Sequence, residues 1–264
     1  MITPERERTV AMLFALAATV VAQAPVRVAD TAGLRAALAE AKPGAVIALV
    51  ASDYDGFSAA NVAGTARQPI VVRGHDAKAP PRFAGGIHLS DVAFVTLEDL
   101  LVEKAPHNGI NIDDGGTADT PSHYVVLRRV VVRDTGSGGN HDGIKVSGVD
   151  DLRIEACTVE RWGRGGSAID MVGCHRVLID GCTLRDRDEG AAATGVQAKG
   201  GSRDVTVRRC RFEHAGERAV NIGGSTGLQY FRPKPEGFEA KDVTVEGCTF
   251  VGSMAPIAFV GCDG

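Results

Sequence analysis

The stretch Gly143–Val159, GIKVSGVDDLRIEACTV, decides the fold, because both of its halves recur along the chain. Its first half, GIKVS, is a small residue followed by apolar residues at the second and fourth positions. Seven segments follow this pattern, with starts 23, 34, 25, 27, 24 and 37 residues apart: Gly86–Ser90, Gly109–Asp113, Gly143–Ser147, Ala168–Val172, Gly195–Lys199, Ala219–Gly223 and Pro256–Val260.

The second half, DLRIEACTV, contains two short alternating stretches joined by a corner. It recurs in four places: Asp151–Val159, Arg176–Leu184, Asp204–Phe212 and Asp242–Phe250. Three short strands per repeat cannot bury their apolar faces alone, whereas coils stacked on one another form a continuous core. A β-sandwich or propeller is the alternative, but propeller blades run nearer 40 residues. The sequence therefore predicts an all-β fold, a parallel β-helix.

Composition agrees with a repetitive β architecture. Glycine supplies 33 of the 264 residues, about one in eight, where average usage is nearer 7%. Aromatic residues are only 5% of the chain, and 44% are apolar, which excludes a disordered protein. The formal net charge of −4 lacks the basic excess of a nucleic-acid-binding surface.

The first part of the chain has the pattern of an export signal. A charged start precedes a 13-residue apolar run from Val10 to Ala22, which is shorter than the roughly 20 residues of a membrane span. We expect residues 1–22 to be a signal peptide. Residues 25–264 then form a single secreted or periplasmic β-helix domain without membrane insertion, which we expect to be a monomer. The stop directly after a strand-like segment predicts truncation at the C-terminus.

A cap should close the N-terminal end of the rod, as solenoids require. The segment Thr31–Lys42 predicts a short capping helix, and Ala45–Val50 predicts the strand after it. Four cysteines share one repeat position and should stack in one interior column; they are Cys157, Cys182, Cys210 and Cys248. We expect free thiols there rather than disulfides, because stacked side chains point in parallel and cysteine packs well as a small apolar residue.

Polar residues gather on one outward column of the recurrent strands. Side chains alternate faces, so the third and fifth positions point outward when the second and fourth point inward. The third positions stack as His88, Asn111, Lys145, Asp170, Gln197, Asn221 and Ala258. Any exposed strand face is polar, and a Lys–Asp neighbour pair is common. The density of titratable groups in the middle coils nevertheless indicates a site.

These groups suit acid–base chemistry, because neighbouring lysines and aspartates tune one another's pKa values. The candidate catalytic residues are Lys199, Lys145, His141, Arg218 and Asp170. Removal of a proton next to a carboxylate needs a base, for which Lys145, Lys199 or His141 qualify. It also needs a cation to neutralise that carboxylate. The cation is either Arg218 or a calcium ion held by Asp113, Asp142 or Asp170.

The loop Ser225–Lys241 concentrates aromatic side chains in a chain otherwise poor in them. Tyr230 and Phe231 are candidates for stacking on sugar rings, while Arg232 and Lys234 are candidates for pairing with carboxylates. In the alternative, the loop packs its aromatics back on the rod. The amides of the outward column complete the candidate substrate-binding set; they are Asn111, Gln197 and Asn221.

The sequence resembles the secreted right-handed parallel β-helix proteins of the pectate-lyase-like superfamily, nearest to the alginate and chondroitinase B-like polysaccharide lyases. The resemblance rests on the cap and first coil, Leu34–Phe57, on Gln68–Gly74 and on the later coils. It implies a lysine base, which Lys199 matches, an assisting arginine and carboxylates that bind calcium. Asn140–Gly143 is also similar to an element of mannuronan C5-epimerases, and galacturonan hydrolases share the fold.

The resulting hypothesis is an exported β-helix protein that binds an acidic polysaccharide and cleaves it by β-elimination. The alternatives are a non-catalytic carbohydrate-binding or surface-interaction module, a uronan C5-epimerase and a glycoside hydrolase.

Overall fold

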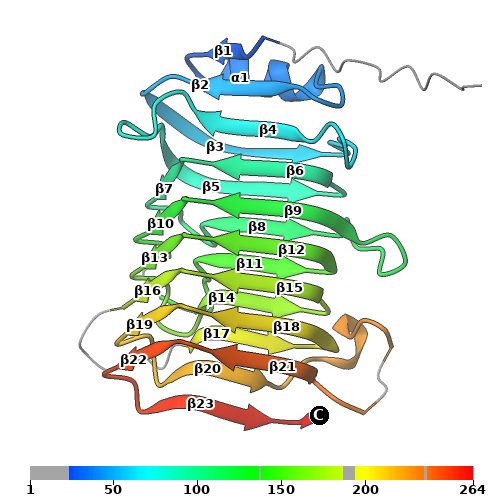
Figure 1. The fold of residues 1–264 in the computed structure, drawn as a ribbon, viewed down its shortest axis with the longest axis vertical. Helices are drawn as coiled ribbons and strands as arrows, with labels where there is room; N and C mark the ends of the chain where they lie inside the picture. The colour runs from blue at the N-terminus through cyan, green and yellow to red at the C-terminus, as the bar shows by residue number, and fades with distance from the viewer. Residues whose placement is uncertain (1–23, 137, 187–193, 235–236, 264) are drawn as a thin grey trace, which may run out of the picture.

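The computed structural model describes residues 24–136, 138–186, 194–234 and 237–263. Their strands run across the long axis of a rod of stacked coils (Figure 1). Pairings between the named strands are parallel throughout both sheets. The predicted all-β parallel β-helix is therefore confirmed. The predicted signal peptide lies outside the described residues, and among those residues no helix has the length and apolar character needed to cross a membrane.

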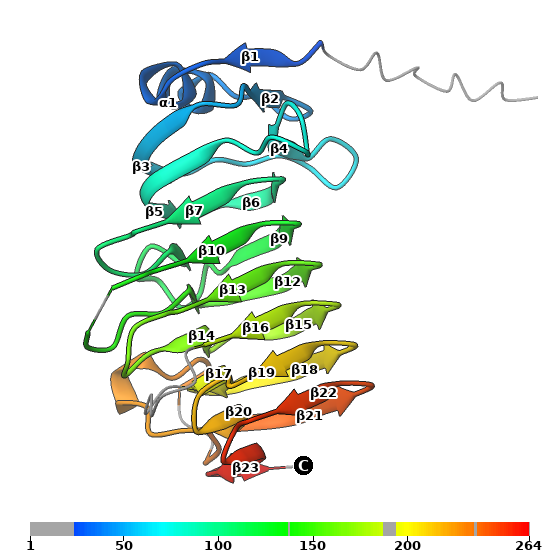
Figure 2. The same ribbon diagram turned by 90° about the vertical axis from the view of Figure 1, so that its left-hand side faces the viewer.

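A cap closes the N-terminal end of the rod (Figure 2). It consists of β1 (Val26–Val28), α1 (Thr31–Ala39) and β2 (Val46–Leu49). The Asp30 side chain accepts a hydrogen bond from the backbone N–H of Gly33 over 2.7 Å, which satisfies a free donor at the start of the helix. The helix ends at Ala39, three residues before the predicted end at Lys42. Pro43 disfavours the helical conformation at Lys42, the residue before it, which excludes the predicted last residue from the helix.

A ten-stranded parallel sheet forms one side of the described rod. After β1 and β2 its strands follow in order: β4 (Ile70–Gly74), β6 (Ala93–Glu98), β9 (Ser122–Arg128), β12 (Val149–Glu155), β15 (His175–Asp180), β18 (Ser202–Arg208), β21 (Ala240–Glu246) and β24 (Cys262–Asp263).

A fourteen-stranded sheet forms the other two sides of the described rod. The first side holds β7 (Leu101–Glu103), β10 (Val131–Arg133), β13 (Thr158–Glu160), β16 (Thr183–Arg185), β19 (Arg211–Glu213) and β22 (Thr249–Val251). The second side holds β8 (Ile110–Asp113), β11 (Ile144–Ser147), β14 (Ser167–Val172), β17 (Thr194–Lys199), β20 (Arg218–Gly223) and β23 (Ala255–Val260). Strand β5 (Arg82–Ser90) pairs with β7, β8 and β3 (Asp53–Ala60), so it joins the two sides. We call β5 together with the second side the site stack.

The apolar positions of the recurrent segments fill the core. In β11, for example, Ile144 and Val146 are fully buried, and Lys145 between them points the other way. Complete burial of such an aliphatic side chain stabilises a fold by ~1.5–3 kcal/mol. Repetition of this arrangement in every coil gives a core of stacked aliphatic rows, which explains why a chain with few aromatic residues folds.

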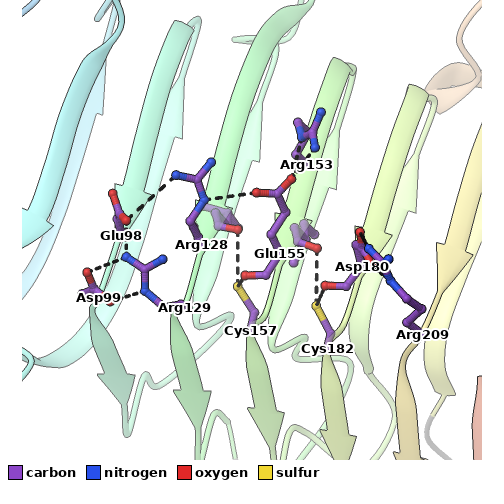
Figure 3. Close-up of polar contacts among 12 residues, drawn as sticks. Glu98, Asp99, Arg128, Arg129, Arg153, Glu155, Cys157, Asp180, Cys182 and Arg209 are labelled. Carbon is purple, nitrogen blue, oxygen red and sulfur yellow. Dashed lines mark hydrogen bonds and ion pairs between the residues drawn. The ribbon is translucent and has the colours of Figure 1, made fainter. Parts of the chain in front are cut away.

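Charged residues line the corner between the ten-stranded sheet and the β7–β22 side (Figure 3). Glu155 accepts hydrogen bonds from Arg128 (3.1 Å) and Arg153 (2.7 Å). Arg129 pairs with Asp99 over 2.7 Å, and both have the left-handed backbone conformation that turns the corner. Exposed ion pairs contribute ~0–1 kcal/mol each to the stability of a fold. We therefore assign these charged residues to the packing of the corner rather than to a reaction.

The cysteine column lies just inside this corner, where Figure 3 shows the thiols of Cys157 and Cys182 on successive coils. Both donate to backbone carbonyl oxygens, of Leu127 and Ile154 respectively, over 3.4 Å. All six cysteines are free thiols, and four of them are buried. The predicted free-thiol column is confirmed.

Candidate functional site

The strand register of the site stack builds the predicted outward column. Lys145 pairs with Asn111 on one side and with Asp170 on the other. The full column follows in the predicted order: His88, Asn111, Lys145, Asp170, Gln197, Asn221 and Ala258. Register is fixed because a shift by one residue would turn the buried aliphatic row toward solvent.

The expectation that this column is exposed is wrong for its central residues. Asp170 and Asn221 are each only 1% exposed, and Asp142, two residues before β11, is 2% exposed. Asp170 is covered because two longer side chains from neighbouring coils, Lys145 and Lys199, fold over it. Asn221 donates to the carbonyl oxygen of Gly223, where the chain leaves β20 and turns back over the column.

Two lysines share one buried carboxylate at the centre of the site. Lys145 Nζ contacts one oxygen of Asp170, and Lys199 Nζ lies 3.2 Å from the other. A second carboxylate, Asp142 Oδ2, lies 3.8 Å from Lys145 Nζ. Burial alone would lower the pKa of Lys145, but attraction to Asp170 and Asp142 outweighs burial and raises it. Lys145 is therefore held as a cation, which argues against it as the base in this arrangement.

Asp142 is the most perturbed carboxyl group of the site. Burial, followed by repulsion from Asp170, raises its pKa to about 6 against the attraction of Lys145. One oxygen of Asp142 accepts a hydrogen bond from the backbone N–H of Ser167 over 2.7 Å, and its own N–H donates to Asn108 Oδ1 over 2.8 Å. The group is rigidly held and changes its charge near neutral pH.

A groove of about 580 Å³ lies over the two lysines. We call it the site groove. Lys145 and Lys199 form part of its floor, and the carboxylates beneath them do not line it. Its walls are the loops before β9 and after β20; the wall and rim residues are Asp114, Gly116, Ala118, Ser225, Thr226, Gly227, Gln229, Tyr230, Phe231 and Arg232. The groove therefore presents ammonium groups to whatever enters it.

The aromatic loop overhangs the groove. Tyr230, at the end of the short helix η1 (Leu228–Tyr230), is 65% exposed, and Phe231 follows it along the wall. Tyr230 is therefore not packed back on the rod, which was one of the two alternatives for the loop, and remains accessible to a ligand in the groove. Lys234 is exposed.

Arg232 differs from its predicted role in substrate binding. It is only 9% exposed, and its guanidinium donates to Asp150 Oδ1 and to the carbonyl oxygen of Gly173, both over 2.7 Å. Its backbone carbonyl oxygen accepts a hydrogen bond from His175 Nε2 over 3.1 Å. The guanidinium of Arg232 is therefore paired within the protein rather than directed at a ligand. These contacts hold the loop against β12 and against the turn after β14.

Sequence reasoning missed the partners that hold this loop. Besides Asp150, Glu239 accepts hydrogen bonds from the backbone N–H groups of Thr226 (2.6 Å) and Gly200 (2.8 Å). Neither acid belongs to a recognisable motif. The loop returns onto coils far away in the sequence, so no local signal could have identified them.

Of the three predicted calcium ligands, Asp142 and Asp170 lie together beside Lys145, and Asp113 lies apart from them. Asp113 accepts hydrogen bonds from His88 and Ser90, each over 2.6 Å, and lies at the opposite end of its strand from the position of Asp142. Asp170 pairs with Lys145 and Lys199, and Asp142 Oδ2 lies 3.8 Å from Lys145 Nζ. Among the described residues no three His, Cys, Asp or Glu side chains converge closely enough to hold a metal ion. The donor set does not fit calcium, because cationic side chains take the place of the metal.

The structure also gives the positions of Arg218, His141 and Gln197 relative to the lysines. Arg218 begins β20 and pairs in register with Thr194, whereas Lys199 is five residues further along its strand. His141 Nε2 lies 3.4 Å from His107 Nδ1, on the side of the site nearer the N-terminal coils. Gln197 remains beside Lys199, and its Oε1 lies 3.5 Å from Lys199 Nζ.

The coil geometry agrees with a family comparison. A family model described as the right-handed β-helix region matches residues 85–263. The chain belongs to the right-handed β-helix family. This confirms the predicted handedness and the resemblance to right-handed parallel β-helix proteins.

The chain is similar to several solved structures. An alginate lyase from Paenibacillus sp. superimposes with a TM-score of 0.64 and 17% identity, over 91% of this chain and 99% of the lyase. The A-module of a mannuronan C-5 epimerase from Azotobacter vinelandii gives a TM-score of 0.49 and 13% identity, over 82% of this chain and 56% of the module. A putative glycosyl hydrolase from Parabacteroides merdae gives 0.46 and 14%, over 68% and 79%. No curated protein matches the sequence significantly.

Proposed function

We propose that this chain binds an acidic, uronic-acid-containing polysaccharide in the site groove and cleaves it by β-elimination. The observation that carries the proposal is the pair of lysine side chains on the groove floor, Lys145 and Lys199, both in contact with the buried Asp170. Cations on the floor of an open groove favour anionic chains. The fold shared with an alginate lyase along nearly its whole length supports a polysaccharide as the ligand.

The chemistry begins with a carboxylate of the polysaccharide beside Lys145. Its ammonium group stabilises the negative charge that grows on this carboxylate when the adjacent C5 proton is removed. A neutral amine takes that proton, the electron pair forms the C4–C5 double bond, and the bond from C4 to the glycosidic oxygen breaks. Water in the open groove protonates the leaving oxygen.

We assign the base to Lys199. Lys145 contacts one oxygen of Asp170, and Lys199 lies beside the other oxygen. Lys145 is additionally held by Asp142 Oδ2 at 3.8 Å. Lys199 Nζ lies 3.2 Å from Asp170, a longer contact than that of Lys145, so Lys199 is held less tightly and can approach the C5 proton.

The wall of the groove supplies the platform for the sugar rings. Tyr230 is exposed beside the lysines and carries a flat apolar face with a hydroxyl at its edge. Such side chains pack on sugar rings while their hydroxyl groups remain hydrogen-bonded. A polymeric substrate also agrees with export, and we propose residues 1–22 as the leader that directs the protein to the periplasm or the exterior.

The deciding experiment incubates the purified protein with alginate, pectate and chondroitin, and follows the ultraviolet absorbance of unsaturated uronate together with new reducing ends. Elimination predicts that both signals rise in parallel. New reducing ends without absorbance would replace the lyase with a hydrolase. Binding without either signal would leave a non-catalytic module, which is the alternative favoured by the tight pairing of Lys145 with Asp170.

A further inference from the structure

A second hollow, of about 400 Å³, opens on the same face nearer the N-terminal cap. We call it the N-terminal hollow. It lies between α1, β3, β5 and the turn before β8. Its polar lining residues are Arg35, Ser58, His88, His107, Asn108 and Asn111. Hydrogen-bond donors thus converge on a concave surface to which no role has been given.

Arg35 gives this hollow its charge. The residue is exposed on α1, and its Nη2 donates to the carbonyl oxygen of Gly56 over 3.3 Å. In the described part of the chain, no carboxylate pairs with Arg35. His88, in contrast, is already paired with Asp113 over 2.6 Å. The guanidinium of Arg35 is therefore the cation that remains available to a ligand.

The N-terminal hollow adjoins the site groove. Asn111 lines the hollow, and its register neighbour on the next coil, Lys145, lies on the groove floor. Coils are separated by about 4.8 Å. Lys199 on β17 is three coils from Asn111 on β8, or about 14 Å along the rod. A chain several sugar units long would reach from the N-terminal hollow to the site groove.

The path from the N-terminal hollow to the site groove runs obliquely to the long axis of the rod. In the groove the lining residues include Ser147, Val172 and Lys199, which end β11, β14 and β17. In the hollow they include His88, in the second half of β5, and Asn111, near the start of β8. Asn108 connects the two regions, because its Oδ1 accepts the backbone N–H of Asp142 while its Nδ2 donates to Asn111 Oδ1 over 3.3 Å.

We propose that the N-terminal hollow is a second subsite for the acidic polysaccharide, in which Arg35 binds the carboxylate of a sugar unit remote from the reacting one. The assignment rests on the proposed function of the site groove. The planar guanidinium matches a carboxylate with two parallel hydrogen bonds. The amides of Asn108 and Asn111 and the hydroxyl of Ser58 are suited to sugar hydroxyl groups.

The test compares short and long ligands. Calorimetry on the Lys199→Ala protein, in which we expect cleavage to be slow, measures the affinities for trimers and octamers of mannuronate and of galacturonate. We expect the octamer to bind more tightly, and Arg35→Ala to reduce the octamer-to-trimer affinity ratio about tenfold, the loss expected for one charge-assisted contact. Arg73→Ala is the matched control, because this exposed arginine lies on β4 in the ten-stranded sheet. It should keep the ratio.

A second variant is needed because Arg35→Ala changes a residue of the cap and could prevent the cap from folding. His107→Ala alters the opposite wall of the hollow, outside α1, and should also lower the ratio. Ratios unchanged in both Arg35→Ala and His107→Ala would overturn the subsite, as would the absence of octamer binding. If the ratio falls as expected but the wild-type protein forms no unsaturated product, the subsite stands and β-elimination is wrong.

Discussion

At the scale of single residues, the two lysines of the groove floor have different expected roles. We expect Lys199→Ala to lower kcat by about 10²–10⁴-fold, the usual contribution of a general base. Lys145→Ala should impair catalysis and substrate binding, because its ammonium group pairs with the substrate carboxylate. Initial rates on the active polymer measure both effects. Lys78→Ala, in an exposed turn, is the control for loss of a positive charge, and equal rates for Lys199→Ala and wild type would refute the assignment.

The pKa of Asp142, raised to about 6 by burial and by Asp170, predicts a pH-dependent contribution to stability. Because the folded protein binds this proton more tightly than the unfolded chain, the contribution is fully present below about pH 4 and is lost as the pH rises through about 6. The test measures the free energy of unfolding by denaturant for the wild type and for Asp142→Asn across this pH range. The free energy of unfolding of the wild type should fall by roughly 1–3 kcal/mol relative to that of the variant. Parallel pH curves would contradict the raised pKa.

The residues of the site also predict the response to metal removal. Lys145 pairs with Asp170 and would also pair with the substrate carboxylate, so the proposed step needs no calcium ion. We expect activity to survive dialysis against a calcium chelator with less than about a twofold change. Restoration of a lost activity by added calcium would show that the substrate completes a metal site.

At the scale of elements, the site stack could be predicted from the sequence and the loop contacts could not. A small residue followed by alternating apolar residues marks each recurrent strand, and the buried rows leave one possible register. The column containing Asn111, Lys145 and Gln197 followed from this. The burial of Asp170 depends on long side chains from adjacent coils, and the pairing of Arg232 with Asp150 joins residues 82 positions apart.

That pairing makes Arg232 a positioning residue for the aromatic loop. Arg232→Ala removes the contacts to Asp150 and Gly173, so we expect faster hydrogen–deuterium exchange across residues 225–232 and about tenfold weaker polysaccharide binding. Exchange in β17 should remain slow. Arg153→Ala is the control, because Arg153 lies on the same strand as Asp150 but pairs with Glu155 on the exposed corner. Unchanged loop exchange in Arg232→Ala would show that other contacts hold the loop.

At the scale of the whole molecule, the thiols report on the integrity of the rod. Cys262 is exposed and Cys248 half-buried, whereas the other four cysteines are buried in the core. We expect an alkylating or disulfide reagent to modify Cys262 quickly and Cys248 more slowly in the native protein, and all six thiols in denaturant. Mass spectrometry of the labelled protein counts them. Rapid native labelling of Cys157 or Cys182 would show that the coils open easily.

The same column has a consequence for how the chain acquires its structure. A rod held together by hydrogen-bonded coils and stacked aliphatic rows, with its thiols unlinked, has no covalent cross-link to form or to rearrange during folding. Its maturation therefore requires neither an oxidant nor a disulfide isomerase. The domain can be produced and refolded under reducing conditions, and a shift in the surrounding thiol–disulfide balance should leave the native rod intact.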